Sequence, residues 1–238
     1  MIPYKAGLSV MKRSSKYIPA LHFHWLTPWY DTIMRRLYPE QAVKTALIAQ
    51  ARIQSGQRVL DVGCGTGTLT LLIKRTHPDA EVHGLDVDPR VLAIARRKAE
   101  QVGEVIVLRQ GTATDLPYLD ETFDRVFASL MLHHLTREDK RRALAEAFRV
   151  LKPGGELHVA DFGKPQDRTM WLISLLVRWA EEVHDNIRGL LPVFMAEAGF
   201  RSVEEISRYR TVSGTIALYR ACKPTGEGAC SHHQGETS

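Results

Sequence analysis

The chain has 238 residues, of which 44% are hydrophobic and 25% are charged. This is the composition of a globular protein with one sizeable core. The net charge of +5 is mildly basic and excludes neither nucleic acid nor an anionic membrane as a partner.

No stretch approaches the roughly 18 apolar residues that a membrane-spanning helix needs. The first residues lack the long apolar segment of a signal peptide, so we expect none. The three cysteines, Cys64, Cys222 and Cys230, do not have the spacing of a disulfide framework. These features predict a reducing, cytoplasmic location, and we expect no metal site.

Along the first half of the chain, an irregular segment gives way to alternating strands and helices. Residues 1–38 contain several prolines and aromatic side chains, and we expect a partly helical cap or lid. Helical periodicity predicts a helix over 40–54 that stops before Gly56. Asp88 and Pro89 are the cap and first residue expected of another helix. We predict strands at 58–62, 81–87, 104–110 and 123–130, and helices at 67–76, 89–102 and 137–151.

The second half continues this alternation and then changes character. Pro153, Gly154 and Gly155 predict a turn before a strand at 156–162. A helix that is apolar nearly all round is expected at 168–183, and a shorter one from Pro192 to Gly199. Residues 201–210 and 211–223 are expected to form an antiparallel pair. The tail, 224–238, has too few apolar residues to fold.

Apolar strands that alternate with helices are typical of a parallel sheet covered on both faces. We therefore predict a doubly wound α/β domain over 39–223, preceded by the cap at 1–38 and followed by a disordered tail. In such a sheet, ligands bind at the carboxyl ends of the strands.

The turn after the first predicted strand is rich in glycine and is preceded by an acid. Residues 58–74 read RVLDVGCGTGTLTLLIK, with Asp61 ahead of the glycines. Glycine lets a ligand approach the backbone closely. A dinucleotide fingerprint counted from Gly63 would need glycine at position 68, where the chain has Thr68. A carboxylate is also unfavourable beside a pyrophosphate, and it suits a ligand with a cationic end.

This turn resembles motif I of the class I S-adenosylmethionine (SAM) dependent methyltransferases, and the resemblance continues along most of the chain. The matching segments are LDVDP (85–89), LPYLDETFDRVFASLMLHHL (116–135), EAFRVLKPGGELHVADF (146–162), FMAEAGF (194–200) and SGTIALYRACKP (213–224). The resemblance implies SAM as the cofactor. It also implies a Rossmann-like methyltransferase fold with seven strands, mostly parallel, of which the last is antiparallel.

The resemblance also implies roles by position. Asp61, Gly63 and Gly65, with Gly67 in the same loop, would face the methionine part and the sulfonium. Asp86 would hold the ribose hydroxyls, with Val87 beside the adenine. The family often has an acid in the third-strand loop, where this chain has Thr112, whose hydroxyl could accept from the adenine amino group. The backbone of Ala113 would lie near the adenine, and Ser129 and Leu130 under the methionyl chain.

Methyl transfer from a sulfonium is a direct displacement, in which alignment of the reactants supplies much of the catalysis. A base is needed only where the acceptor must lose a proton. His133 and His134 follow the fourth predicted strand and are candidates for that base, or else scaffold residues. Tyr30 in the cap is a candidate for closing over SAM.

The acceptor is less well specified by the sequence. The segment after the fourth strand lacks the pattern typical of nucleobase amino-methylation, so we expect no nucleic-acid partner. Tyr30-Asp31, RVLKPGG and the last strand resemble the ubiquinone/menaquinone C-methyltransferases and related phospholipid N-methyltransferases. The chain departs from the quinone enzymes after the fifth strand, where Asp161-Phe162-Gly163 replaces E-x-S. Residues 169–179 could admit a lipophilic substrate, contact a membrane surface or a second chain, or pack as a buried helix.

The sequence therefore predicts a methyltransferase for a small or lipophilic acceptor that resembles a quinone, a phospholipid or a metabolite. Three alternatives remain: a non-catalytic SAM-binding regulatory protein, an RNA or protein methyltransferase, and a nicotinamide-dependent oxidoreductase. Thr68 and Asp61 argue against the last.

Overall fold

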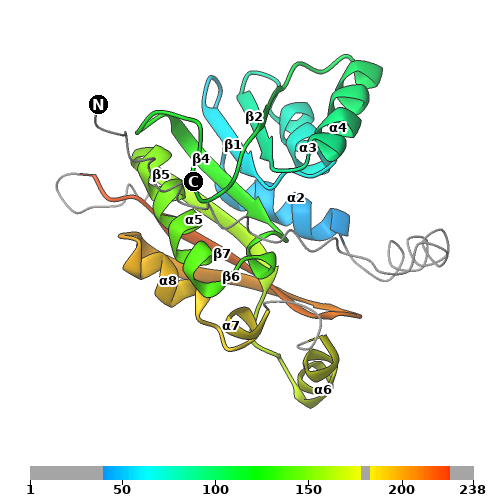
Figure 1. The fold of residues 1–238 in the computed structure, drawn as a ribbon, viewed down its shortest axis with the longest axis vertical. Coiled ribbons are helices and arrows are strands. Elements are labelled where there is room, and N and C mark those ends of the chain that lie inside the picture. Colours follow the sequence, from blue (N-terminus) through cyan, green and yellow to red (C-terminus); the bar gives the residue numbers. More distant parts are fainter. Residues whose placement is uncertain (1–39, 178–182, 226–238) are drawn as a thin grey trace, which may run out of the picture.

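The computed structural model describes residues 40–177 and 183–225. They form one sheet of seven strands with helices on both faces (Figure 1). The strands are β1 (Arg58–Val62), β2 (Glu81–Asp86), β3 (Val107–Gln110), β4 (Phe123–Ser129), β5 (Leu151–Phe162), β6 (Arg201–Thr211) and β7 (Gly214–Cys222). The helices are α2 (Glu40–Ala51), α3 (Thr68–Thr76), α4 (Pro89–Val102), η1 (Leu132–His134), α5 (Arg137–Val150), α6 (Arg168–Val177), α7 (His184–Ile187) and α8 (Leu191–Glu197).

The strand order is β3-β2-β1-β4-β5-β7-β6. Neighbours from β3 to β5 pair in parallel, whereas β7 pairs antiparallel with both β5 and β6. The predicted doubly wound sheet with an antiparallel last strand is therefore confirmed. Strands β2 and β3 are added on one side of β1, and β4 and β5 on the other, so the carboxyl ends of β1 and β4 form the switch point at which such sheets bind ligands.

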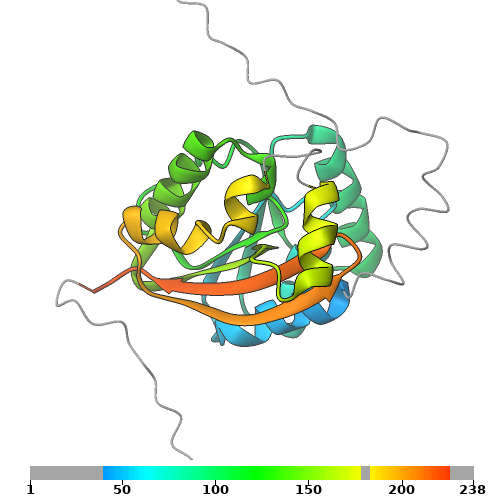
Figure 2. The ribbon, with the colours of Figure 1, turned by 90° about the horizontal axis from the view of Figure 1, so that it is seen from below.

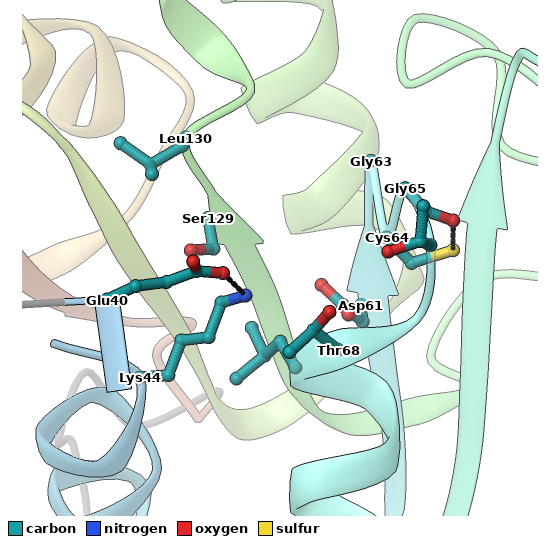
Figure 3. A pocket seen from close by; sticks show the side chains of 11 residues that line it. Glu40, Lys44, Asp61, Gly63, Cys64, Gly65, Thr68, Ser129 and Leu130 are labelled. Atoms are coloured by element: carbon teal, nitrogen blue, oxygen red, sulfur yellow. Dashed lines mark hydrogen bonds and ion pairs between the residues drawn. The ribbon is translucent and has the colours of Figure 1, made fainter. Parts of the chain in front are cut away.

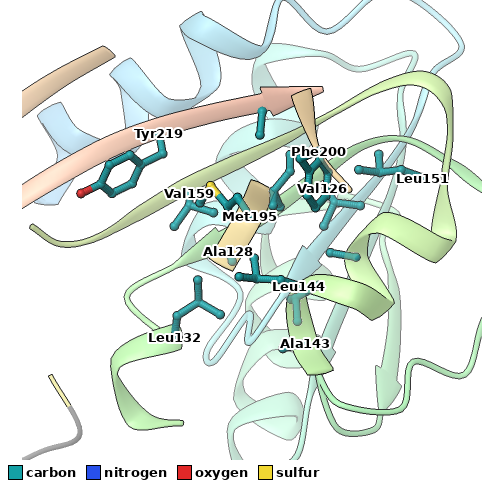
Figure 4. Close-up of a cluster of buried hydrophobic side chains, with 14 of the residues drawn as sticks. Val126, Ala128, Leu132, Ala143, Leu144, Leu151, Val159, Met195, Phe200 and Tyr219 are labelled. Carbon is teal, nitrogen blue, oxygen red and sulfur yellow. The ribbon is translucent and has the colours of Figure 1, made fainter. Parts of the chain in front are cut away.

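Two apolar clusters hold the helices against the sheet. On one face, α5 and α8 pack over β4 and β5, and the cluster includes Val126, Leu144, Val159 and Met195 (Figure 4). On the other face, α2 and α3 pack over the strands through residues such as Leu47 and Ile73. Figure 2 shows α5 and α8 on one side of the sheet and α2 on the other. Burial on both faces explains why the strands are continuously apolar rather than alternating.

The boundaries of α4 agree with its sequence signals. Asp88 is the N-cap and accepts a hydrogen bond from the backbone N of Arg90 at 2.8 Å, while Pro89 is the first residue of the helix. Gly103 ends the helix in the left-handed conformation, with a φ of 69°. Each signal acts within a few residues, so the local sequence alone determines this helix.

Other boundaries differ from the prediction. The first described helix ends at Ala51 rather than at residue 54, because Arg52 adopts a positive φ of 45°. The third strand begins at Val107, not at 104. The predicted turn at Pro153-Gly154-Gly155 lies inside β5: Phe123 pairs with Leu151 and Arg125 with Glu156, so residues 152–155 bulge out of the ladder.

The predicted helix at 168–183 is described as α6 up to Val177, and residues 178–182 lie outside the described residues. The short helix α7 was not predicted. The predicted cap at 1–38, with Tyr30, and most of the predicted tail also lie outside the described residues, so the proposed domain boundaries stay predictions.

Candidate functional site

A cavity of about 210 Å³ opens at the carboxyl ends of β1 and β4 (Figure 3). Three parts of the chain line it: the first turn of α2, the glycine turn after β1 with the start of α3, and the end of β4. The lining residues are Glu40, Lys44, Asp61, Gly63, Cys64, Gly65, Thr66, Thr68, Leu69, Ser129 and Leu130. The sequence predicted five of them as site residues: Asp61, Gly63, Gly65, Ser129 and Leu130.

Asp61 lies at the base of the cavity and is 1% exposed. Its carboxylate accepts a hydrogen bond from the Thr70 hydroxyl at 2.7 Å. Burial raises the pKa of Asp61 from 3.8 to about 6, although Thr70 and the positive charge of Lys44 act in the opposite direction. A carboxylate in this position is stabilised by any cation that enters the cavity.

The three glycines of the turn have different roles. All have positive φ: 71° at Gly63, 53° at Gly65 and 73° at Gly67. A Cβ on Gly65 would meet no atom of the described residues within 4 Å, so this part of the chain leaves the backbone open to a ligand. A Cβ on Gly67 would lie 2.9 Å from the Cβ of Ala95, and Gly67 is buried and does not line the cavity. Gly67 is therefore explained by the packing of α3 against α4.

Asp86 organises the glycine turn from the end of β2. Its two carboxylate oxygens accept hydrogen bonds from the backbone N of Gly65 at 2.8 Å and from that of Asp88 at 3.0 Å. The adjacent Val87 is 54% exposed and is available to a flat apolar group. Asp86 does not line the cavity, and its second lone pairs remain for a ligand such as a ribose.

The loop after β3 is held beside the end of β2 by a hydrogen bond between their backbones. The N of Gly111 donates to the carbonyl of Asp86 at 3.0 Å. The hydroxyl of Thr112 lies 3.0 Å from that of Thr114 and accepts from the Thr114 backbone N at 3.3 Å. Thr112 and Ala113 do not line the cavity, so their predicted contacts with adenine stay predictions.

Beyond β4, His133 lies beside a buried carboxylate. Nδ1 of His133 is 2.9 Å from Oδ1 of Asp161, and the His133 backbone N donates to Oδ2 of Asp161 at 3.3 Å. The same carboxylate accepts from the backbone N of Phe162 at 2.7 Å and from the side-chain amide of Asn186 at 3.0 Å. Burial by itself would raise the pKa of Asp161, but His133 and these hydrogen bonds lower it below its usual value.

The two predicted histidines differ in environment. His133 is 5% exposed, whereas His134 is exposed, and their ring centroids are 4.0 Å apart. Leu130, which lines the cavity, is only three residues before His133, and its backbone N donates to Ala160 at the end of β5. The His133–Asp161 pair therefore lies at the same edge of the sheet as the cavity.

Several site residues were not identified from the sequence. Lys44 and Glu40 come from a helix that was predicted but given no role, and Thr70 and Asn186 carry no local motif. Asp161 was noted only for its departure from a family pattern. The signal that could have found Asp161 is an acid at the carboxyl end of an apolar strand, the same position that Asp61 and Asp86 occupy.

The segment 169–179 is described only in part. In α6, Met170 is buried, whereas Trp171 and Leu172 are 56% and 60% exposed. Contact of this segment with a membrane or a substrate stays a prediction. In the described ranges, no helix is long and apolar enough to cross a bilayer. The same ranges contain no cluster of three His, Cys, Asp or Glu side chains placed to bind a metal ion.

The residues of the cavity fit SAM better than a dinucleotide. Two carboxylates and one ammonium, from Asp61, Glu40 and Lys44, suit a ligand that carries charges of both signs. A pyrophosphate would bring two negative charges next to a buried acid, which is unfavourable. The open backbone at Gly65 gives such a ligand close access to the turn.

Comparison with known proteins gives the same cofactor. Residues 59–155 match a family model described as a methyltransferase domain. The chain is 37% identical over 158 residues to a demethylmenaquinone methyltransferase of Thermus thermophilus, covering 63% of this chain and 69% of that protein. It is 31% identical to a ubiquinone/menaquinone biosynthesis C-methyltransferase of Pasteurella multocida, covering 90% of this chain and 88% of that protein.

Solved structures show the same fold at lower identity. The YcgJ protein of Bacillus subtilis has a TM-score of 0.65 and 19% identity, covering 78% of this chain and all of that chain. The [4+2]-cyclase SpnF has a TM-score of 0.63 and 22% identity, covering 78% of this chain and 81% of that chain. Because these similar structures include a cyclase, the fold alone does not establish methyl transfer.

The sequence relatives and the geometry of the cavity together identify the activity, which the fold alone does not establish. The chain belongs to the family of ubiquinone/menaquinone C-methyltransferases and demethylmenaquinone methyltransferases, and it is a SAM-dependent methyltransferase.

Proposed function

We propose that this enzyme methylates a ring carbon of a quinone-like acceptor and that His133 accepts the proton which leaves that carbon. The names of the relatives support the acceptor class, since both act in quinone biosynthesis or on a demethylated quinone. The hydrogen-bonded His133–Asp161 pair is the observation that carries the role of His133.

The chemistry requires a proton acceptor. SAM supplies an electrophilic methyl group, which a nucleophilic carbon takes by direct displacement. Because the new methyl replaces a ring hydrogen, one proton must leave for each methyl gained. A histidine that is held by a carboxylate through Nδ1 is suited to take it at Nε2, since the carboxylate fixes the tautomer and stabilises the imidazolium that forms.

The other residues bind and orient. Asp61 offers its carboxylate to the cationic end of the donor, and the open backbone at Gly65 allows close approach. We assign Asp86 to the ribose hydroxyls and Ser129 and Leu130 to the methionyl chain, in keeping with their positions at the ends of β2 and β4.

The proposal is tested with the full chain, SAM and a reduced, detergent-solubilised 2-prenyl-1,4-naphthoquinone that lacks the ring methyl. Mass spectrometry of the product and release of S-adenosylhomocysteine report the reaction. Turnover of a phospholipid amine or an RNA in place of this acceptor would contradict the acceptor class.

The role of His133 is tested by His133→Asn, which keeps an N–H donor for Asp161 but cannot take a proton. We expect kcat to fall by roughly 10²–10³-fold, with an unchanged KM for SAM. The matched control is His134→Asn on the neighbouring exposed ring. Equal losses in the two variants, or full activity of His133→Asn, would assign the proton to another group.

A further inference from the structure

The first turn of α2 places an ion pair in the wall of the cavity, and the mechanism above does not use it. The Lys44 ammonium is paired with the Glu40 carboxylate, four residues earlier in the same helix. The Lys44 side chain is 13% exposed and that of Glu40 is 44% exposed. Figure 3 shows the Lys44 ammonium between the carboxylates of Glu40 and Asp61.

The position of Lys44 is determined by how α2 packs on the sheet. The side chain of Gln50 donates to the carbonyl of Tyr219 at 3.1 Å and lies 3.1 Å from Nδ1 of His158. Arg125 donates from Nε to the carbonyl of Ala51 at 2.8 Å. These contacts hold the C-terminal end of α2, and the buried side chains of Val43, Leu47 and Ile48 pack the rest of the helix against the sheet. Lys44 is therefore held in the cavity wall rather than extended into solvent.

An ammonium in this position has unused hydrogen-bonding capacity. It carries three N–H donors, and among the described residues Glu40 is the one that accepts from it. An ion pair of this spacing on a helix surface contributes only about 0.2–0.5 kcal/mol. That contribution does not account for keeping a lysine mostly out of water, whereas an anionic group of a ligand in the same cavity would.

The negative and positive charges of the cavity lie on different parts of its wall. Asp61 supplies a buried negative charge, and among the described residues that line the cavity Lys44 supplies the one positive charge. A ligand with a sulfonium and an amino acid carries both signs at the same end. The lysine is placed for the carboxylate of the amino acid, and Asp61 for the cationic part.

We propose that Lys44 binds the carboxylate of the amino-acid end of SAM and that Glu40 is a positioning residue which holds the ammonium in the cavity. Lys44 is then a specificity-determining residue that distinguishes SAM and S-adenosylhomocysteine from adenosyl thioethers without an amino-acid tail. The inference rests on the proposed function, because it requires that this cavity holds the methyl donor.

The test is isothermal titration calorimetry of the full chain with three ligands. S-adenosylhomocysteine has the whole amino-acid tail, decarboxylated SAM lacks only the carboxylate, and 5′-methylthioadenosine lacks the tail. For Lys44→Ala we expect the affinity for S-adenosylhomocysteine to fall about 10–100-fold, as for a lost hydrogen bond between charged groups. The affinities for decarboxylated SAM and 5′-methylthioadenosine should change less than about twofold.

The matched control is Lys152→Ala, which removes a lysine from an ion pair with Asp124 at the opposite edge of the sheet. It should leave the affinities for all three ligands unchanged. Glu40→Gln should weaken binding of S-adenosylhomocysteine less than Lys44→Ala does, and Glu40→Asp should restore part of the loss.

An equal loss of affinity for all three ligands in Lys44→Ala would mean that the lysine maintains the shape of the cavity and does not bind the carboxylate. Unchanged affinity for S-adenosylhomocysteine would also overturn the inference. Failure of the proposed function gives a different result: the unmodified chain would bind S-adenosylhomocysteine and transfer no methyl to the quinone-like acceptor, whatever the Lys44 variants do.

Discussion

Two buried carboxylates at the same edge of the sheet have opposite electrostatic environments. Asp61 is the second-last residue of β1 and Asp161 the second-last residue of β5, and both are buried. Burial raises the pKa of Asp61 to about 6, whereas the pKa of Asp161 is below its usual value because His133 and several hydrogen bonds outweigh burial.

The difference lies in what the protein itself supplies to each group. Asp161 accepts from two backbone N–H groups, the ring of His133 and the amide of Asn186. Asp61 accepts from the neutral hydroxyl of Thr70, and its nearest positive charge belongs to Lys44 across the cavity. The protein itself supplies the partners of Asp161, and in the proposed function a cationic ligand supplies the further partner of Asp61. A charge at Asp61 that the protein stabilises only weakly is typical of a binding site. A charge at Asp161 that is fully hydrogen-bonded is typical of a rigidly held group.

The largest expected effect is on Asp161. Asp161→Asn replaces one acceptor oxygen of the carboxylate with an NH₂ donor, so the four donors that Asp161 pairs with lose part of their pairing. We expect the free energy of unfolding to fall by about 3–5 kcal/mol, as for other broken buried charge pairs. Urea unfolding at pH 7 measures this. Unchanged stability would show that the His133–Asp161 contact contributes little.

Replacing Asp61 should change stability in the opposite direction, because it removes a destabilising buried charge. The pKa of Asp61 rises from 3.8 to about 6 on folding, so the folded state binds more protons than the unfolded state between these pH values. The stability of the ligand-free protein therefore falls as pH rises from about 4 to about 6, by about 3 kcal/mol in all, and is then level. Asp61→Asn should lack this slope and should be about 1–3 kcal/mol more stable at pH 7.

Urea unfolding of both proteins at several pH values between 4 and 7 measures the difference, and groups common to the two proteins cancel. The same variant should bind SAM at least about tenfold more weakly, since the cationic end loses its partner. A variant that is destabilised at pH 7 would contradict the assignment of an unpaired buried charge to Asp61.

The smallest effects separate the glycines of the turn. Gly67→Ala adds a Cβ 2.9 Å from that of Ala95 at a positive φ, and should cost about 2–3 kcal/mol of stability. Gly65→Ala places its Cβ within 4 Å of none of the described residues, and should cost about 1–2 kcal/mol of stability from its positive φ. Calorimetry should nevertheless show the larger loss of SAM binding in Gly65→Ala. The reverse order of binding losses would place the ligand against Gly67.

Much of this site could be predicted because its signals are local. The turn at 63–67 and the caps of α4 each act through backbone conformations of a few consecutive residues, so residue type and spacing were sufficient. The family resemblance of LDVDP (85–89) singled out Asp86, and its role toward the ribose stays a prediction. The bulge at 152–155 was assigned to a turn because the same residues favour both, and only pairing with β4 and β7 distinguishes them.

By itself, the sequence determined the order of the elements, the glycine turn and the family resemblance that implied SAM, because these depend on short-range geometry and residue identity. Only the tertiary structure decided that Asp161 pairs with His133, 28 residues earlier, and that Lys44 reaches the cavity beside Asp61. Those contacts arise from the packing of whole helices and strands against each other. No local pattern of residues specifies which distant side chain will lie beside a given buried charge.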